Sequence, residues 1–145
     1  MTSTAAAPLA EQLAFLVAQA DRRLSGRLGV VLREADLPLE QWRVLEILSD
    51  GTGRTVSELA DRALLNLSAL SKMIDRMASR ALIFRAPDPT DGRRVQVFIS
   101  DHGLDLHRRL KPEVERCEAS LQRQLGRKSS AELKRLLSAL VRQAV

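Results

Sequence analysis

The chain has 145 residues, of which 45% are hydrophobic and only 3% aromatic, and its formal net charge is +5. A single cysteine, Cys117, excludes an intramolecular disulfide framework and any zinc site built from several cysteines. No run of residues approaches the roughly 20 apolar positions of a membrane span, and residues 1 to 8 lack the basic start and apolar centre of a signal peptide. We therefore expect a cytoplasmic protein with no membrane partner.

The N-terminal part of the sequence predicts two helices. Apolar residues recur at helical spacing from Leu9 to Leu32, which favours one long amphipathic helix over residues 8 to 35. Pro38 suits the first turn of a second helix, which carries Trp42. Leucine and alanine, both strong helix formers, supply much of the apolar content, so a mainly helical fold is expected.

The next segment predicts a helix-turn-helix. Thr55 and Glu58 are spaced as a capping box, in which each side chain accepts the main-chain N–H of the other, so a short helix is expected over residues 56 to 63. Asn66 is a suitable N-cap for a longer helix over residues 67 to 80. A short helix, a turn and a longer helix with one polar face form this motif. The predicted apolar stripe of the longer helix comprises Leu67, Leu70, Ile74 and Met77.

Two strand-like runs follow, over residues 81 to 85 and 95 to 99. Between them, residues 88 to 94 contain Asp-Pro and Asp-Gly, which are turn formers, so a β-hairpin is expected. Arg93 and Arg94 lie at its tip, where they suit contact with phosphate or a DNA groove.

Two further helices complete the prediction. Asp101 is expected to cap a helix over residues 102 to 125, which Gly126 ends. Residues 129 to 132, Ser-Ser-Ala-Glu, resemble a second capping box at the start of the last helix. The terminal helices have broad apolar faces without a partner in a small winged domain, so we expect them to pair with each other and with a second subunit.

The expected fold class is therefore mainly α with a small β-hairpin wing (α+β). Residues 37–100 are expected to form the winged helix-turn-helix DNA-binding region. Residues 1–36 and 101–145 are expected to form a helical dimerisation region.

The order of these elements resembles the MarR family of transcriptional regulators over residues 9 to 142. The motifs are Gln-Trp-Arg-Val-Leu at 41–45, Thr-Val-Ser-Glu-Leu-Ala at 55–60, Leu-Ser-Ala-Leu-Ser-Lys-Met-Ile-Asp-Arg at 67–76 and Asp-Pro-Thr-Asp-Gly-Arg-Arg at 88–94. The resemblance implies a homodimer that binds palindromic operators in double-stranded DNA and is often released by a small ligand, commonly an aromatic carboxylate. Ala81 stands where the family often has glycine, directly after the helix over residues 67 to 80, which the resemblance makes the recognition helix. We expect this helix to end differently, because alanine disfavours a left-handed cap.

The recognition helix and the wing carry the candidate DNA contacts. In such folds the N-terminal half of the helix enters the major groove, where short polar side chains and a lysine read base edges or phosphates. The resemblance implies that Asp91 orients Arg93, which enters the minor groove. The alternative is an ordinary solvated helix face beside a solvated turn. The predicted DNA-binding residues are Thr55, Asn66, Ser68, Ala69, Leu70, Ser71, Lys72, Arg76, Asp91, Arg93 and Arg94.

The resemblance also implies a ligand pocket between the dimer helices and the winged module. Arg23 and Arg27 offer cations for a carboxylate, while Trp42 and His107 offer flat walls for an aromatic ring. The alternatives are a solvated edge for the arginines and a core or interface position for the two rings.

Other chemistry finds little support in the sequence. Cys117 lies on an apolar stripe and is expected to be a buried packing residue. His102 and Asp105 share a helix face, but two candidate ligands are too few for a metal. We predict no catalytic residues, no metal, no cofactor and no enzyme activity. The predicted function is a homodimeric repressor relieved by a small aromatic carboxylate-like ligand, and the alternative is a structural or chromatin-associated DNA-binding protein without an effector.

Overall fold

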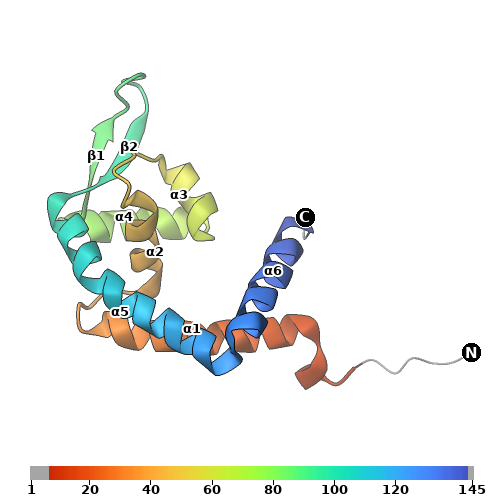
Figure 1. Cartoon of the computed structure of the whole chain (residues 1–145). Coiled ribbons are helices and arrows are strands. Elements are labelled where there is room, and N and C mark those ends of the chain that lie inside the picture. The colour runs from red at the N-terminus through yellow and green to blue at the C-terminus, as the bar shows by residue number, and fades with distance from the viewer. Residues whose placement is uncertain (1–6, 144–145) are drawn as a thin grey trace, which may run out of the picture. The chain divides into compact units, whose positions relative to one another are not determined.

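Helices make up most of the chain, and one antiparallel hairpin interrupts them (Figure 1). The computed structural model describes residues 7–143. The chain divides into two compact units, the first ending at Leu110 and the second beginning at Lys111. In chain order the elements are η1 (Leu9–Glu11), α1 (Leu13–Arg33), α2 (Leu39–Leu48), α3 (Val56–Ala63), α4 (Leu67–Ser79), β1 (Ile83–Pro87), β2 (Val95–Ile99), α5 (Asp101–Leu125) and α6 (Arg127–Gln143).

The first predicted helix is interrupted near its start. A short 3₁₀ turn, η1, precedes Gln12, whose backbone is extended with φ −72° and ψ 133°, and α1 begins only at Leu13. The side-chain amide of Gln12 donates to the carbonyl of Ala7 at 3.1 Å, so local bonds hold this break. The prediction of one continuous helix over residues 8 to 35 is therefore wrong at its N-terminal end.

The helix-turn-helix forms as its caps predict. The Thr55 hydroxyl accepts the Glu58 amide at 3.2 Å, and the Glu58 carboxylate accepts the Thr55 amide at 3.3 Å. The side-chain oxygen of Asn66 accepts the Ala69 amide at 2.8 Å and starts α4. These bonds satisfy main-chain donors that a helix start leaves unpaired. Three members of the predicted stripe of α4 are buried, but Leu67, its first residue, is 53% exposed.

The hairpin pairs β1 with β2 in an antiparallel register from Ile83 opposite Ile99 to Pro87 opposite Val95. Strand β2 has the predicted bounds, whereas β1 begins two residues later than predicted. The reason is a turn directly after α4, in which Ala81 has a left-handed φ of 58°.

Two expected helix caps are wrong. The cap of α5 is Ser100, not Asp101, because the Ser100 hydroxyl accepts the Gly103 amide at 2.9 Å. In the second unit, α6 begins at Arg127 directly after Gly126, which has a φ of 89°. Residues 129–132 therefore lie inside α6, where the Ser130 hydroxyl donates to the carbonyl of Gln122 at 3.1 Å instead of capping.

Apolar side chains divide between a buried core and exposed helix faces. Burial of the core stabilises the first unit, since each fully buried leucine contributes roughly 1.5–3 kcal/mol. Ten large apolar residues on α1 and α6 are 38–74% exposed. The buried apolar residues are Leu32, Leu37, Trp42, Val44, Leu45, Leu48, Leu59, Ala60, Ala63, Leu70, Ile74, Met77, Leu82, Ile83, Val97, Leu106 and Leu110.

Helix α4, the expected recognition helix, is followed by a left-handed residue although that residue, Ala81, is not glycine. The Ala81 amide donates to the carbonyl of Ala78 at 2.9 Å and the Leu82 amide to that of Met77 at 3.0 Å, a pattern that normally uses glycine at the Ala81 position. The expectation that Ala81 would change the helix end is therefore wrong. Ala81 adopts the left-handed conformation and carries the backbone strain that this conformation causes in a residue other than glycine.

Ala81→Gly should raise the free energy of unfolding by about 0.5–1 kcal/mol, because relief of left-handed strain exceeds the added chain entropy of the unfolded state. Ala78→Gly, inside α4, is the matched control and should lower it by roughly 0.5–1 kcal/mol. Urea unfolding of both variants measures the difference. Loss of stability in the Ala81 variant would contradict the strain argument.

Candidate nucleic-acid interface

The face of α4 opposite its buried stripe carries five of the eleven predicted DNA-binding residues. Ser68, Ala69, Ser71, Lys72 and Arg76 are all exposed on this helix. The prediction for Leu70 is wrong: its side chain is 0% exposed and packs into the core, so it cannot touch DNA. Because Leu70 also belongs to the apolar stripe, helical spacing already assigned it to the core.

Thr55 and Asn66, also predicted as DNA contacts, use their side-chain oxygens for capping. Capping occupies acceptors and leaves donors: the Thr55 hydroxyl hydrogen and the Asn66 amide NH₂ remain able to donate. Thr55 is half-buried and Asn66 is exposed. Both residues keep a donor of the kind that phosphate oxygens accept.

Two carboxylates near this face are paired with arginines of the wing. Arg85 of β1 lies 2.5 Å from the Asp75 carboxylate of α4, and Arg94 lies 3.7 Å from that of Glu58 on α3. The pairs tie the hairpin to both helices of the motif and neutralise acids that would repel phosphate. Sequence reasoning missed both pairs, because no local pattern links residues so far apart in the chain.

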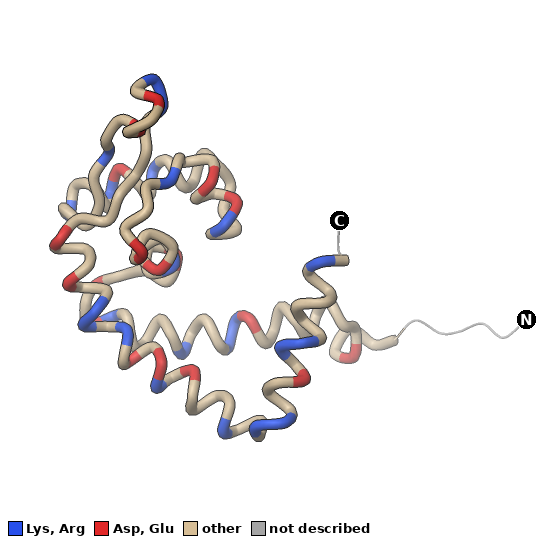
Figure 2. The backbone as a smooth tube through the Cα atoms, turned by 45° about the horizontal axis from the view of Figure 1, so that its top comes forward, with Lys and Arg blue, Asp and Glu red and all other residues tan. Residues whose placement is uncertain are grey.

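Three of the four basic residues predicted to contact DNA have no carboxylate partner among the described residues. Within residues 7–143, the side chains of Lys72, Arg76 and Arg93 make no ion pair with a carboxylate. All three are exposed, and they lie on α4 and at the hairpin tip. Figure 2 shows the basic positions at that tip, next to an acidic one. This arrangement offers positive charge to a polyanion from two separate elements.

Hydrogen bonds within the turn hold the tip in place. The Asp88 carboxylate accepts the Thr90 amide at 2.8 Å and the Thr90 hydroxyl at 2.9 Å. Asp91 accepts the main-chain amide of Arg93 at 3.2 Å, so it orients the backbone of Arg93 and does not pair with its guanidinium. The bond from the Thr90 amide is the main cause that holds the pKa of the Asp88 carboxyl below its ordinary value.

The segment around Arg54, which precedes α3, packs against strand β2 of the hairpin. Arg54 pairs with Val97 through two main-chain hydrogen bonds of 3.0 and 2.7 Å. Beside it, a Cβ on Gly53 would lie 2.5 Å from the Phe98 ring, so a side chain here would push that ring away. Phe98 in turn stacks on Phe84, with ring centroids 5.4 Å apart. Gly53 therefore permits close packing under the wing.

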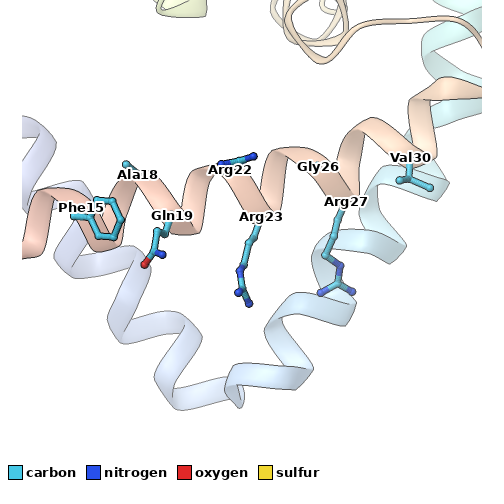
Figure 3. Close-up of a pocket in the computed structure, with 8 residues that line it drawn as sticks. All are labelled: Phe15, Ala18, Gln19, Arg22, Arg23, Gly26, Arg27 and Val30. Carbon is cyan, nitrogen blue, oxygen red and sulfur yellow. The ribbon is translucent and has the colours of Figure 1, made fainter. Parts of the chain in front are cut away.

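The four predicted ligand-binding residues separate into two groups. Arg23 and Arg27 line a cavity of about 720 Å³ along α1, together with Phe15, Gly26 and Val30 among others. Figure 3 shows the two arginine side chains extending from the same side of α1.

Trp42 and His107 do not line this cavity. They stack on each other with centroids 5.0 Å apart, and His107 Nε2 lies 2.9 Å from a Glu46 carboxylate oxygen. Trp42 is buried and belongs to the core of the first unit. The two rings thus join the start of α5 to α2.

Residues 7–143 hold no group of three or more His, Cys, Asp or Glu side chains placed to bind a metal ion. Cys117 is half-buried on α5. Across the same part of the chain, no helix has the length and apolar character needed to cross a membrane.

A capped helix pair, an exposed polar recognition helix and a basic hairpin define a winged helix-turn-helix DNA-binding protein. The family model described as the MarR family matches residues 35–94. The HTH-type transcriptional repressor IacR of Pseudomonas putida is 33% identical over 122 residues, which cover 84% of this chain and 71% of the relative. The chain belongs to the MarR family of transcriptional regulators.

Solved structures agree with this assignment. The transcriptional repressor CouR bound to a 23-mer DNA duplex is similar with a TM-score of 0.84 and 26% identity, covering 92% of this chain and 94% of that one. BpsR of Bordetella bronchiseptica, whose DNA binding is regulated by 6-hydroxynicotinic acid, has a TM-score of 0.85 and 21% identity over 94% of this chain and 97% of its own. At that identity BpsR shows the shared fold.

The Asp88 turn gives a pH-dependent signature. The Asp88 carboxylate stabilises the turn when the pH lies above the pKa of this carboxyl in the unfolded chain. Because the pKa is lower in the folded protein, this stabilisation is lost only as the pH falls through the folded pKa. We therefore expect the Thr90 amide proton resonance to titrate with a midpoint below 3.8. NMR titration measures it, with Asp88→Ala as the control that should abolish the step. A midpoint at or above 3.8 would show that the carboxylate does not hold the turn.

Proposed function

We propose that this regulator is a homodimeric, sequence-specific repressor that binds a palindromic operator and is relieved by a small aromatic carboxylate. The observation that carries the DNA-binding part is the exposure of Lys72, Arg76 and Arg93 on the recognition helix and the wing of one unit. Ser68 and Ser71 lie on α4 just before Lys72 and suit base-edge contacts. Thr55, Asn66, Ala69, Asp91 and Arg94 complete the proposed interface.

The exposed apolar faces support the homodimer. On α6, Leu133, Leu136, Leu137 and Leu140 recur at helical spacing and are 38–51% exposed. Contiguous apolar surface of this kind usually marks an interface. A second copy offers the same stripes and covers them symmetrically. Residues 1–36 and 101–145 would then form the dimerisation region, and residues 37–100 the DNA-binding region.

Selection from random duplexes tests the DNA-binding proposal. The protein should enrich a sequence with two inverted half-sites one helical turn apart, about 34 Å, because two symmetric recognition helices read two symmetric sites. Sedimentation of the protein with this duplex should give two copies per duplex. Enrichment of no sequence would favour the alternative of a structural DNA-binding protein.

Arg93→Ala should weaken operator binding by about 1–3 kcal/mol and reduce the slope of log affinity against log salt by about one, because a groove or phosphate contact is lost. Arg33→Ala is the matched control. Arg33 ends α1, which Figures 1 and 2 place on the other side of the module from the hairpin. Fluorescence anisotropy across a salt series measures both variants. Equal affinity and slope for wild type and Arg93→Ala would remove Arg93 from the interface.

The α1 cavity supports the ligand part of the proposal. Its volume falls in the range of small-molecule sites, roughly 300–1,000 Å³, and apolar Phe15 and Val30 share it with Arg23 and Arg27. Such a lining combines a wall for a ring with a cation for a carboxylate. The structurally similar BpsR responds to an aromatic acid, 6-hydroxynicotinic acid. Trp42 and His107 lie outside this lining, so in our proposal they connect α2 to α5 and do not touch the ligand.

A panel of small aromatic acids should release the operator from the wild-type protein, and Arg23→Gln should raise the required concentration roughly 10- to 100-fold by removing a charge-assisted hydrogen bond. Arg33→Gln, outside the cavity lining, should respond as the wild type does. Anisotropy titration of preformed complexes measures the release. An unchanged response in Arg23→Gln would place the ligand elsewhere, and no response to any acid would favour a regulator with another signal.

A further inference from the structure

Three segments meet at the end of the recognition helix. The first segment is the turn that directly follows α4, which comprises Arg80, Ala81 and Leu82. The Ser100 amide donates to the Leu82 carbonyl at 3.1 Å, and the Ser100 hydroxyl donates to the Ala81 carbonyl at 2.6 Å. The same hydroxyl accepts the Gly103 amide at 2.9 Å. One serine side chain thus caps α5 and fixes it to the end of α4.

The approach of α5 to this turn is unusually close. A Cβ on Gly103 would lie 2.1 Å from the Leu82 carbonyl oxygen, which is backbone and cannot rotate away. Only glycine permits such an approach. The start of α5 therefore has little freedom to slide or tilt against the end of α4 while these contacts persist.

Arg80 makes the corresponding connection to α1. Its guanidinium donates to the Asp36 carbonyl at 2.7 Å and to the Ala35 carbonyl at 3.0 Å, just beyond the C-terminal end of α1. Asp36 itself has a left-handed φ of 49°. The fork of an arginine suits two neighbouring acceptors, because its N–H groups are fixed in one plane. The end of α4 is therefore held by the chain that leaves α1 and by the chain that enters α5.

We propose that Arg80 and Ser100 are positioning residues, which set the angle of the recognition helix relative to α1 and α5 and thereby the spacing of the two recognition helices in the dimer. The inference rests on the proposed homodimer and palindromic operator. We call these contacts of Arg80, Ala81, Leu82, Ser100 and Gly103 the clasp.

The consequence of a loosened clasp is geometric. Half-sites one helical turn apart lie about 34 Å from centre to centre, so each recognition helix is about 17 Å from the two-fold axis. A change in the angle of each helix that moves it along the DNA by about 3.4 Å, one base-pair rise, places it one base pair out of register with its half-site. A half-site does not sense this displacement, whereas a full palindrome does.

The test compares Ser100→Ala with wild type on two duplexes, one with both half-sites and one with a single half-site beside scrambled sequence. The ratio of full-site to half-site affinity should fall by about 2- to 30-fold, the range typical of mutations in coupling elements. Ser100→Thr keeps the hydroxyl and should restore the ratio. Duplexes with one base pair added or removed between half-sites should be discriminated less by Ser100→Ala than by wild type.

Ser49→Ala is the matched control. The Ser49 hydroxyl donates at 2.7 Å to the Glu46 carbonyl of its own helix, so its loss removes a hydrogen bond without touching the clasp. Arg80→Met provides a second variant, which removes both bonds to the chain after α1 and should lower the same ratio. Thermal unfolding measures the folded fraction of each variant, and each affinity is calculated from the concentration of folded protein.

The outcomes separate the two proposals. A wild-type protein without preference for the full palindrome over the half-site would overturn the proposed homodimeric function. A wild-type preference that Ser100→Ala and Arg80→Met leave unchanged would overturn the positioning role alone. Equal loss on both duplexes would show that the clasp contributes only stability, which also overturns it.

Discussion

The reversal of the chain after α4 is the constraint on which the rest of the first unit depends. Ala81 adopts a left-handed conformation there, and the next residues begin both the hairpin and the contact with α5. If Ala81 were in a helical conformation, α4 would continue and Ile83 would not reach Ile99 in the first pair of the sheet. The strain of about 1–2 kcal/mol at a non-glycine residue is offset by the bonds that the Ala81 and Leu82 carbonyls accept.

The distribution of charge over the wing follows from the same packing. The hairpin lies against α3 and α4, where Arg85 and Arg94 meet Asp75 and Glu58. Because each is paired with an acid, these arginines add little net positive charge to the face that DNA meets, although Arg94 remains part of the proposed interface. The formal charge of +5 is therefore distributed unevenly over the protein. The cations without a carboxylate partner define the proposed DNA-binding face better than the total charge does.

Local signals made much of the fold predictable, and long-range contacts explain the rest. The capping box at Thr55 and the cap at Asn66 depend on residues three positions away, so the sequence predicts the bounds of α3 and the start of α4. Ser100 was missed as the cap of α5 because its neighbour Asp101 is an equally good candidate until the Ala81 carbonyl is placed beside it.

The candidate site shows the same division between local and distant information. Exposure of Ser68 and Lys72 follows from helical spacing, and so does burial of Leu70, which spacing should have removed from the DNA contacts. The bonds of Arg80 join residues 44 and 45 positions apart. In the described chain α1 buries only Leu32, so this helix depends on such end contacts and, in the proposed homodimer, on a second copy that covers its apolar face. If the proposed homodimer forms, dimer formation and the placement of the recognition helix depend on the same contacts at the end of α1.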